Sequence, residues 1–253
     1  MRTKQTENSL KGKNALVTGA AKRLGREVAR GLARKGANVV IHYHSSKEEA
    51  HQLRQELLEV GVESWVVRAD LSSSEELNGL LQEGVQTSGS LDILVNNASI
   101  FPPGTFSEMT WDELTRNLKI NAWAPYKLSA AFSERTDKGA IVNLLDTRIR
   151  GYDWGHVPYY LSKVVLARLT RLSAVEFAPH IRVNGVAPGL ILPPEGESEE
   201  YMEQMLDRIP LRRRGWPKDI VETVIFLLEN TFITGEVIFV DGGRHLLEER
   251  SGS

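Results

Sequence analysis

Tyr159 and Lys163 stand four residues apart at the start of a segment with a helical pattern of apolar residues. Side chains at this spacing lie on the same face of a helix, one turn apart. A free tyrosine has a pKa of about 10, too high for efficient acid–base chemistry at neutral pH. An ammonium group about 4 Å away, at an effective dielectric constant of about 20, favours the phenolate by ~4 kcal/mol. We therefore predict that Tyr159 exchanges protons with a substrate and that Lys163 lowers its pKa.

A second set of polar and small residues follows short apolar segments that are typical of buried strands. Its members are Asn96, Asn97, Ala98, Ser99, Asp146, Pro188 and Gly189. Asn121 lies in a long helical segment, and Asp146 precedes Tyr159 by thirteen residues. The carboxyl ends of parallel strands meet at one edge of a sheet, where such folds bind ligands. Asp146 alone could cap a loop, but its spacing from Tyr159 favours a catalytic role.

The elements that would position these residues alternate between strands and helices. The predicted strands span residues 15–18, 38–42, 63–67, 91–95, 140–145, 181–186 and 236–240. The predicted helices span residues 24–35, 47–60, 110–134, 158–177, 199–208 and 217–229, with another after the capping serines at 72–74. Continuous apolar strands indicate a parallel sheet covered on both faces. We predict one doubly wound α/β domain over 11–247, with a substrate loop at about 190–212 and flexible tails at 1–10 and 248–253.

The composition excludes several classes of protein. The chain has 253 residues, with 31 Lys and Arg against 33 Asp and Glu, so no basic field suggests a nucleic-acid partner. It has no cysteine, which excludes disulfides, thiolate catalysis and cysteine-ligated metals, and we expect no metal site. The first ten residues hold no apolar leader, and no segment approaches ~18 apolar residues. We therefore expect a cytoplasmic protein without a membrane partner.

The turn after the first predicted strand has the spacing of a phosphate-binding loop. Gly19 permits a tight turn, and Gly25 permits the next helix to start close to the strand. Backbone N–H groups at that helix N-terminus can then bind a pyrophosphate. Such a loop can also exist without a ligand, but its place after the first strand favours a dinucleotide. The residues expected to contact it here are Gly19, Lys22, Arg23, Leu24 and Gly25.

The end of the second strand bears on the type of dinucleotide. NAD-binding folds place a carboxylate about 20 residues after the glycines, where it would repel a 2′-phosphate. Here the first carboxylate is Glu48, and Lys22 and Arg23 lie nearby, so we predict NADP, used as NADPH. Further contacts are expected from His42, Tyr43, His44, Ser45, Ser46, Asp70 and Leu71. The two histidines could instead be neutral surface residues, and Asp70 suits adenine and a helix cap equally.

Taken together, these motifs resemble the short-chain dehydrogenase/reductase superfamily over nearly the whole chain. The motifs are Thr18-Gly19 with Gly25, Asn96-Asn97-Ala98, Asn121, Tyr159 with Lys163, and Pro188-Gly189. The resemblance implies a Rossmann-type sheet of about seven strands, and a homotetramer built partly from the C-terminal strand and last helices. It implies that Tyr159 is the acid, that Lys163 also binds the nicotinamide ribose, and that Asn121 relays protons through water. It extends the cofactor site to Asn97, Ala98, Ser99, Pro188, Gly189 and Leu190.

Three positions depart from the general pattern of that superfamily. Arg23 replaces the middle glycine of the phosphate turn, Ser99 replaces the glycine after Asn-Asn-Ala, and Asp146 replaces the serine that normally precedes the tyrosine. These departures together resemble the pteridine reductases. Segments 42–44 and 97–101 are also similar to that group.

Pterin chemistry accounts for these departures. A ring nitrogen must receive a proton as hydride reaches the adjacent carbon, and Asp146 beside Tyr159 can share and supply that proton. We expect Phe101, although a phenylalanine is more often part of a core, to cover one face of the ring. Arg23 is expected to reach both the pyrophosphate and the pterin edge. The expected substrate contacts are Arg23, Ser99, Phe101, Asp146, Tyr159 and Leu190, while Tyr152, Trp154 and His156 either shape the pocket or face solvent.

The predicted reaction transfers a hydride from NADPH to a dihydropterin and gives the tetrahydro form. Segments 188–192 and 241–246 are similar to bacterial dihydromonapterin reductases, so dihydromonapterin or dihydrobiopterin is the expected type of substrate, with dihydrofolate as a further candidate. Two alternatives stay open. A reductase of the same fold would act on a carbonyl such as a 3-oxoacyl thioester or a sugar, and a sensor would bind NADPH without turnover.

Overall fold

The computed structural model of the chain describes residues 9–194, 196 and 199–248. Within them, strands form one parallel sheet in the order β3-β2-β1-β4-β5-β6-β7. The strands are β1 (Asn14–Val17), β2 (Asn38–Tyr43), β3 (Ser64–Arg68), β4 (Ile93–Asn96), β5 (Gly139–Leu144), β6 (Ile181–Pro188) and β7 (Val237–Val240). The order runs outward in both directions from β1, so β1 and β4 flank the switch point where doubly wound sheets bind ligands.

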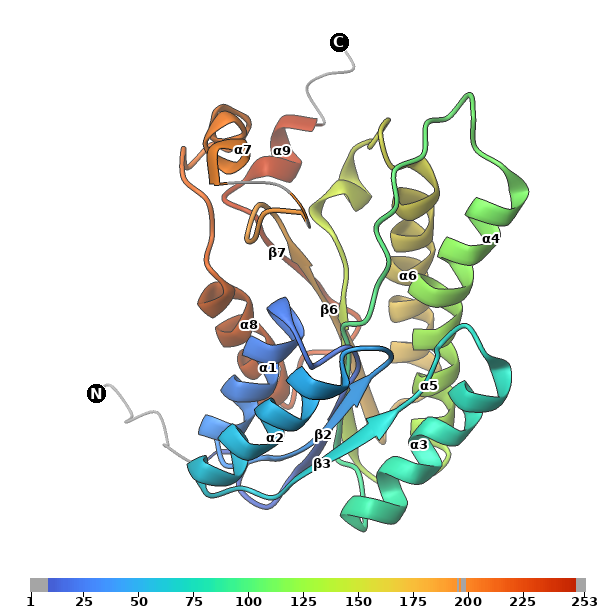
Figure 1. The fold of residues 1–253 in the computed structure, drawn as a ribbon, viewed down its shortest axis with the longest axis vertical. Helices are drawn as coiled ribbons and strands as arrows, with labels where there is room; N and C mark the ends of the chain where they lie inside the picture. The colour runs from blue at the N-terminus through green and yellow to red at the C-terminus, as the bar shows by residue number, and fades with distance from the viewer. Residues whose placement is uncertain (1–8, 195, 197–198, 249–253) are drawn as a thin grey trace.

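Helices cover both faces of this sheet (Figure 1). One face carries α1 (Arg23–Arg34), α2 (Lys47–Val60) and α8 (Pro217–Glu229). The other carries α3 (Ser74–Ser88), α4 (Trp111–Leu118), α5 (Ala124–Ser133) and α6 (Val157–Glu176). Two clusters of buried aliphatic side chains fill the layers between sheet and helices. The predicted Rossmann-type α/β domain is confirmed, and its strands are continuously apolar because both faces are buried.

The long helix predicted over 110–134 is interrupted in its middle. A π-helical turn, Lys119–Trp123, separates α4 from α5. Pro125 stands in the first turn of α5 and has no N–H to donate to the Asn121 carbonyl at α-helical spacing. Single π turns of this kind are frequent at functional sites. Asn121 therefore lies at an irregularity in the helix rather than in a regular segment.

Smaller differences concern the ends of the domain and the substrate loop. The helix predicted over 199–208 is α7 (Glu199–Gln204) followed by a short 3₁₀ turn at Leu206–Arg208. A 3₁₀ turn at Thr147–Arg150 and the helix α9 (Arg244–Glu248) were not predicted. Leu10 is buried in the first cluster and its N–H bonds to the Lys35 carbonyl at 2.9 Å, so packing begins before residue 11. Of the tails expected at 1–10 and 248–253, residues 1–8 and 249–253 lie outside the described residues.

Among the described residues, no helix combines the length and the apolar composition that a membrane span requires.

Candidate active site

Asp146 and Tyr159 meet at the carboxyl edge of the sheet. Asp146 follows β5, and Tyr159 lies in the first turn of α6, which Pro158 helps to start. The Tyr159 hydroxyl donates a hydrogen bond to Asp146 Oδ2 at 2.8 Å. Asp146 Oδ1 accepts from the backbone N–H of Arg148 at 2.8 Å, so the 3₁₀ turn orients the carboxylate. The thirteen-residue spacing thus corresponds to direct contact.

The electrostatics of Tyr159 differ from the prediction. Burial raises the pKa of Tyr159 well above its usual value, and the Asp146 carboxylate raises it further, against a weaker opposing effect of Arg148. The predicted lowering of this pKa by Lys163 is therefore not present. Lys163 Nζ lies 5.7 Å from the centre of the tyrosine ring and donates to the Leu144 carbonyl at 2.8 Å. The phenol is a group that keeps its proton.

Lys163 is itself buried, with 3% of its surface exposed. Burial lowers the pKa of Lys163 to about 8, and the Asp146 carboxylate acts in the opposite direction. At neutral pH the ammonium form still dominates. The site therefore contains one buried cation beside a carboxylate and a protonated phenol.

Asn121 connects three parts of the site. Its Oδ1 accepts from the Ile100 N–H at 2.9 Å and from the Ser99 hydroxyl at 3.1 Å. Its Nδ2 donates to the Ile100 carbonyl and to the Ser162 hydroxyl, both at 3.0 Å. The side chain therefore holds the loop after β4 against α6. Ser99, which was expected to contact phosphate or the pterin, here directs its hydroxyl to Asn121.

The phosphate turn is held from β4. Asn97 Nδ2 donates to the carbonyls of Thr18 and Gly19 at 2.9 and 3.1 Å. The Thr18 hydroxyl accepts from the backbone N–H groups of Asn97 and Ala98 at 2.9 and 3.0 Å. Gly19 has a φ of +63°, which a side chain would disfavour. A Cβ on Gly25 would lie 2.3 Å from the Gly19 carbonyl oxygen, so only glycine fits there.

His42 has a different role from the one predicted. Its Nδ1 accepts from the Gly19 N–H at 3.0 Å, and its Nε2 lies 3.0 Å from the Ala69 carbonyl, so the ring is neutral with hydrogen on Nε2. Burial lowers its pKa to about 4, which maintains this form. With 1% of its surface exposed, His42 cannot reach a 2′-phosphate. It braces the phosphate turn instead, while Tyr43 ends β2 and His44 to Ser46 form the accessible turn beyond it.

Asp70 acts within its own loop. Its Oδ1 accepts from the Ser72 N–H at 2.8 Å, and this hydrogen bond is the main cause of its lowered pKa. The other carboxylate oxygen lies 3.7 Å from His44 Nε2. Leu71 beside it is buried. Asp70 therefore organises the start of the loop before α3 and, at the same time, faces the turn after β2.

Phe101 contacts three other side chains of the site and is 37% exposed. His156 stacks on it, with ring centroids 3.9 Å apart, and Tyr159 meets its edge at 4.6 Å. The Arg148 guanidinium lies over the ring at 5.4 Å. That Phe101 covers a pterin face stays a prediction, and His156 and Arg148 are the side chains that position its ring. Arg148 was not predicted as a site residue, because an arginine eleven residues before Tyr159 belongs to no sequence pattern that indicates a role.

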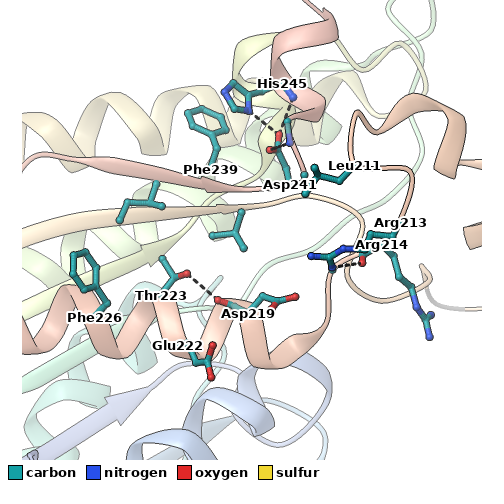
Figure 2. A pocket seen from close by; sticks show the side chains of 15 residues that line it. Leu211, Arg213, Arg214, Asp219, Glu222, Thr223, Phe226, Phe239, Asp241 and His245 are labelled. Atoms are coloured by element: carbon teal, nitrogen blue, oxygen red, sulfur yellow. Dashed lines mark hydrogen bonds and ion pairs between the residues drawn. The ribbon is translucent and has the colours of Figure 1, made fainter. Parts of the chain in front are cut away.

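Asp241 forms a second network of hydrogen bonds, next to Asp146 in the fold. Its Oδ2 accepts from the Thr147 hydroxyl. It also accepts from the His245 N–H at 2.8 Å and from His245 Nδ1 at 2.9 Å (Figure 2). Burial raises the pKa of Asp241, but these hydrogen bonds outweigh it, and the pKa is lowered. Gly189, directly after β6, lets the chain pass close to Asp241, since a Cβ on Gly189 would lie 2.6 Å from Asp241 Cα. Thr147, Asp241 and His245 were not predicted as site residues.

Sequence and structural relatives agree with this geometry. A profile for the family described as enoyl-(acyl carrier protein) reductase matches residues 19–245. The 3-oxoacyl-[acyl-carrier-protein] reductase FabG of Staphylococcus aureus strain Mu50 is 38% identical over 248 residues, which cover 92% of this chain and 98% of that protein. The chain belongs to the short-chain dehydrogenase/reductase superfamily.

Two solved structures align with this short-chain dehydrogenase/reductase over most of its length. FolM alternative dihydrofolate reductase 1 from Brucella canis, complexed with NADP, aligns with a TM-score of 0.90 at 32% identity, over 94% of this chain and 96% of its own. A putative short-chain alcohol dehydrogenase from Sinorhizobium meliloti 1021 aligns with a TM-score of 0.87 at 31% identity, over 94% and 98%. The resemblance inferred from the motifs is confirmed, and the chain is an oxidoreductase of a superfamily that uses nicotinamide dinucleotides.

The phosphate turn of this short-chain dehydrogenase/reductase fits a dinucleotide. No described side chain caps the start of α1, and its first turn contains no acidic residue, so its N–H groups suit an anion. Lys22 lies at this end and pairs with Glu49 at 2.7 Å. Arg23, which replaces the middle glycine of the superfamily pattern, has a φ of +52°, in the left-handed region that glycine favours. Its guanidinium donates to the Pro193 carbonyl. Leu190 is buried, and its carbonyl accepts from the Gly215 N–H at 3.0 Å, which anchors the start of the substrate loop.

Proposed function

We propose that this chain is an NADPH-dependent pteridine reductase that converts a dihydropterin to the tetrahydro form. The observation that carries the proposal is the 2.8 Å hydrogen bond between the Tyr159 hydroxyl and Asp146. A carbonyl substrate needs one donor to its oxygen. Reduction beside a ring nitrogen needs a group that stores a proton and releases it to that nitrogen, which a carboxylate beside a phenol can do.

The residues have distinct parts in this reaction. NADPH, when bound, supplies the hydride to the pterin carbon. Tyr159 keeps its proton because burial and Asp146 raise its pKa, so it is a donor until a ring nitrogen takes the proton. Asp146 is half-buried and reaches solvent, so it can collect the replacement proton. The Lys163 ammonium, buried nearby, offsets the negative charge of the pair.

The cofactor assignment rests on charge at the turn after β2. Lys22 and the segment from His44 to Ser46 present polar and cationic groups there, and no Asp or Glu ends β2. The Glu49 carboxylate nearby is already paired with Lys22. The Brucella canis FolM structure, complexed with NADP, supports the phosphorylated cofactor, and its description as an alternative dihydrofolate reductase supports a pterin-containing substrate.

A carbonyl substrate is the second candidate. The 38% identity to the FabG protein of Staphylococcus aureus, a 3-oxoacyl-[acyl-carrier-protein] reductase, favours it. Tyr159, Lys163 and Asn121 suit both reactions equally. Asp146 is the residue that separates them, because a carbonyl oxygen requires a hydrogen-bond donor and an ionised carboxylate has none.

The test compares two classes of substrate, pterins and a thioester, on the parent chain and one variant. Purified chain is mixed with NADPH and either dihydromonapterin, dihydrobiopterin or dihydrofolate, or an acetoacetyl thioester, and loss of NADPH absorbance is followed. We expect oxidation with the pterins, and loss of this activity by at least about 100-fold in Asp146→Ser. No oxidation with any pterin rejects the proposal. Thioester reduction that survives Asp146→Ser supports the second candidate.

We also propose that the chain assembles as a homotetramer. Large apolar side chains are exposed along α4 to α6, among them Trp111, Trp123, Leu172 and Val175. A pocket of about 660 Å³ separates the free-edge strand β7 from α8, with Phe226 and Phe239 on its wall (Figure 2). Apolar surface of this extent is typical of subunit contacts. Light scattering of the purified protein tests the assembly, and a monomer at micromolar concentration rejects it.

A further inference from the structure

A pocket of about 720 Å³ lies next to the catalytic group, and the proton chemistry above leaves it unexplained. Its wall consists of the segment after Asp146, the 3₁₀ turn after α7, and α9. The lining residues are Arg148, Tyr152, Asp153, Trp154, Gly155, His156, Met205, Asp207, Arg208, Arg244 and Leu247. A pocket of this volume accommodates a drug-sized group. We refer to it as the tail pocket.

Two residues of the tail pocket, Arg148 and His156, also contact the immediate neighbours of Tyr159. Arg148 donates its backbone N–H to Asp146 at 2.8 Å and places its guanidinium over Phe101. His156 stacks on the same ring, and the edge of that ring contacts Tyr159. A substrate whose ring is reduced at Tyr159 therefore has the tail pocket as the adjacent space for whatever the ring carries.

The wall combines exposed aromatic rings with positive charge. Tyr152 and Trp154 are 72% and 68% exposed, and their rings lie 6.0 Å apart at the pocket mouth. Such rings accept an aryl or apolar group with little loss of conformational freedom. Exposed aromatic side chains on a pocket wall are more consistent with a ligand than with a core.

Among the described residues, Arg208 on this wall has no acidic partner. Asp153 pairs with Arg148 at 2.7 Å, and Asp207 pairs with Arg212 outside the pocket. Arg208 is exposed, and within the described ranges no carboxylate pairs with it. A guanidinium presents planar paired donors that match a carboxylate or a phosphate. The tail pocket therefore has an unmatched anion receptor at the turn after α7.

We infer that the tail pocket binds an anionic tail on the pterin substrate, with Arg208 on the terminal anion and Tyr152 and Trp154 along the linking group. The inference rests on the proposed pterin reduction and specifies which pterins are preferred. The shared chemistry is a terminal carboxylate or phosphate, joined to the ring by an aryl group or a short chain. A dihydropterin with a short uncharged side chain leaves the pocket unused.

The test measures binding without turnover. The complex of the enzyme with NADP⁺ is titrated with dihydrofolate, with a dihydropterin that carries a phosphate ester, and with dihydrobiopterin, and quenching of tryptophan fluorescence gives each Kd. We expect at least one anionic ligand to bind about tenfold more tightly than dihydrobiopterin, the size of one charge-assisted hydrogen bond. If dihydrofolate binds more tightly, the preferred anion is a carboxylate; if the phosphate ester binds more tightly, it is a phosphate. This preference is expected to disappear in Arg208→Gln and to weaken as salt is raised.

The matched control is Arg213→Gln. Arg213 is an exposed arginine five residues after Arg208, and it lines the pocket between β7 and α8 instead of the tail pocket. It is expected to retain the preference. Equal affinity for charged and uncharged ligands, or an unchanged preference in Arg208→Gln, overturns the proposal that the tail pocket binds an anionic tail. Either result leaves the proposal of pterin reduction intact. Failure of every pterin to bind, together with no NADPH oxidation, overturns both proposals.

Discussion

The two halves of the site are held together in different ways. On the cofactor side, Asn97 and His42 form hydrogen bonds with the backbone of the phosphate turn, and the Thr18 hydroxyl accepts from the backbone N–H of Asn97. On the substrate side, Phe101, His156 and Arg148 hold one another through side-chain contacts. Backbone bracing gives one rigid geometry that suits an invariant pyrophosphate. Side-chain packing can be changed residue by residue, which suits a site that sets substrate specificity.

The largest effect is expected from Gly25→Ala on the cofactor side. The new Cβ would meet the Gly19 carbonyl and Asn97 Nδ2, at 2.3 and 2.5 Å, and neither group can move without breaking the turn. We expect NADPH affinity to fall by at least about 100-fold, measured by fluorescence titration. Gly79→Ala is the control, because an added Cβ on exposed Gly79 meets nothing within 4 Å, and it should raise stability by up to about 1 kcal/mol. Equal NADPH affinity in the two variants would show that the turn is not rigid.

Acid should destabilise the same half through His42. Its pKa is about 4 in the folded chain against about 6.5 unfolded, so between these values the unfolded chain binds more protons. The free energy of unfolding should therefore fall by about 3 kcal/mol as the pH falls from ~6.5 to ~4. His42→Gln keeps an acceptor for Gly19 and a donor for Ala69 but does not titrate. Denaturant unfolding of both proteins measures the free energy of unfolding at each pH, and this free energy should fall less steeply toward acid pH in the variant. An identical pH dependence in the two proteins would contradict the role of His42.

On the substrate side, Lys163→Met should separate stability from activity. The pKa of Lys163 is about 8 in the folded chain against the ordinary lysine value of 10.5, so below pH ~8 the fold contains an unfavourable buried charge. Stability of the parent chain should rise with pH between ~8 and ~10.5, because there the unfolded chain binds more protons. At pH 7 the free energy of unfolding of the variant should be about 1–3 kcal/mol higher than that of the parent chain. The variant should also lose turnover. A less stable variant would indicate that the ammonium is fully compensated.

The smallest effect is expected at the Asp241 network next to Asp146. Thr147→Val keeps the shape and removes one donor, while Asp241 retains both His245 donors and the Gly243 N–H. We expect kcat to fall several-fold, about 1 kcal/mol, with the KM for NADPH unchanged, because Asp146 is adjacent. Thr87→Val on α3 makes the same substitution at an exposed threonine whose hydroxyl bonds only to carbonyls of its own helix. A fall in kcat in both variants would point to general destabilisation instead.

Sequence reasoning predicted the two halves to different extents. The fold, the strand ends and the contact between Asp146 and Tyr159 were accessible because glycines, strand pattern and residue spacing act locally along the chain. His42 was expected to contact the cofactor, with a neutral surface histidine as the alternative, because nothing in a sequence distinguishes an exposed histidine from one whose two nitrogens bond to Gly19 and Ala69.

The substrate side was harder for a related physical reason. Phe101 was expected to face a ligand, but its partner His156 is 55 residues away in sequence, and stacking carries no sequence spacing. The pKa of Tyr159 was expected to fall because only Lys163 was considered. Burial, which depends on the whole fold, determines the direction instead.

Arg23 links the two halves of the site. Its backbone lies in the phosphate turn, in a left-handed conformation that costs about 1 kcal/mol for a residue with a side chain, and its guanidinium contacts Pro193 of the substrate loop. If a bound pyrophosphate takes this guanidinium, the loop loses that contact. Thermodynamic linkage then requires reciprocity: whatever factor the cofactor applies to substrate affinity, the substrate applies to cofactor affinity. Replacing Arg23 by glycine would relieve the strain and uncouple the two binding equilibria.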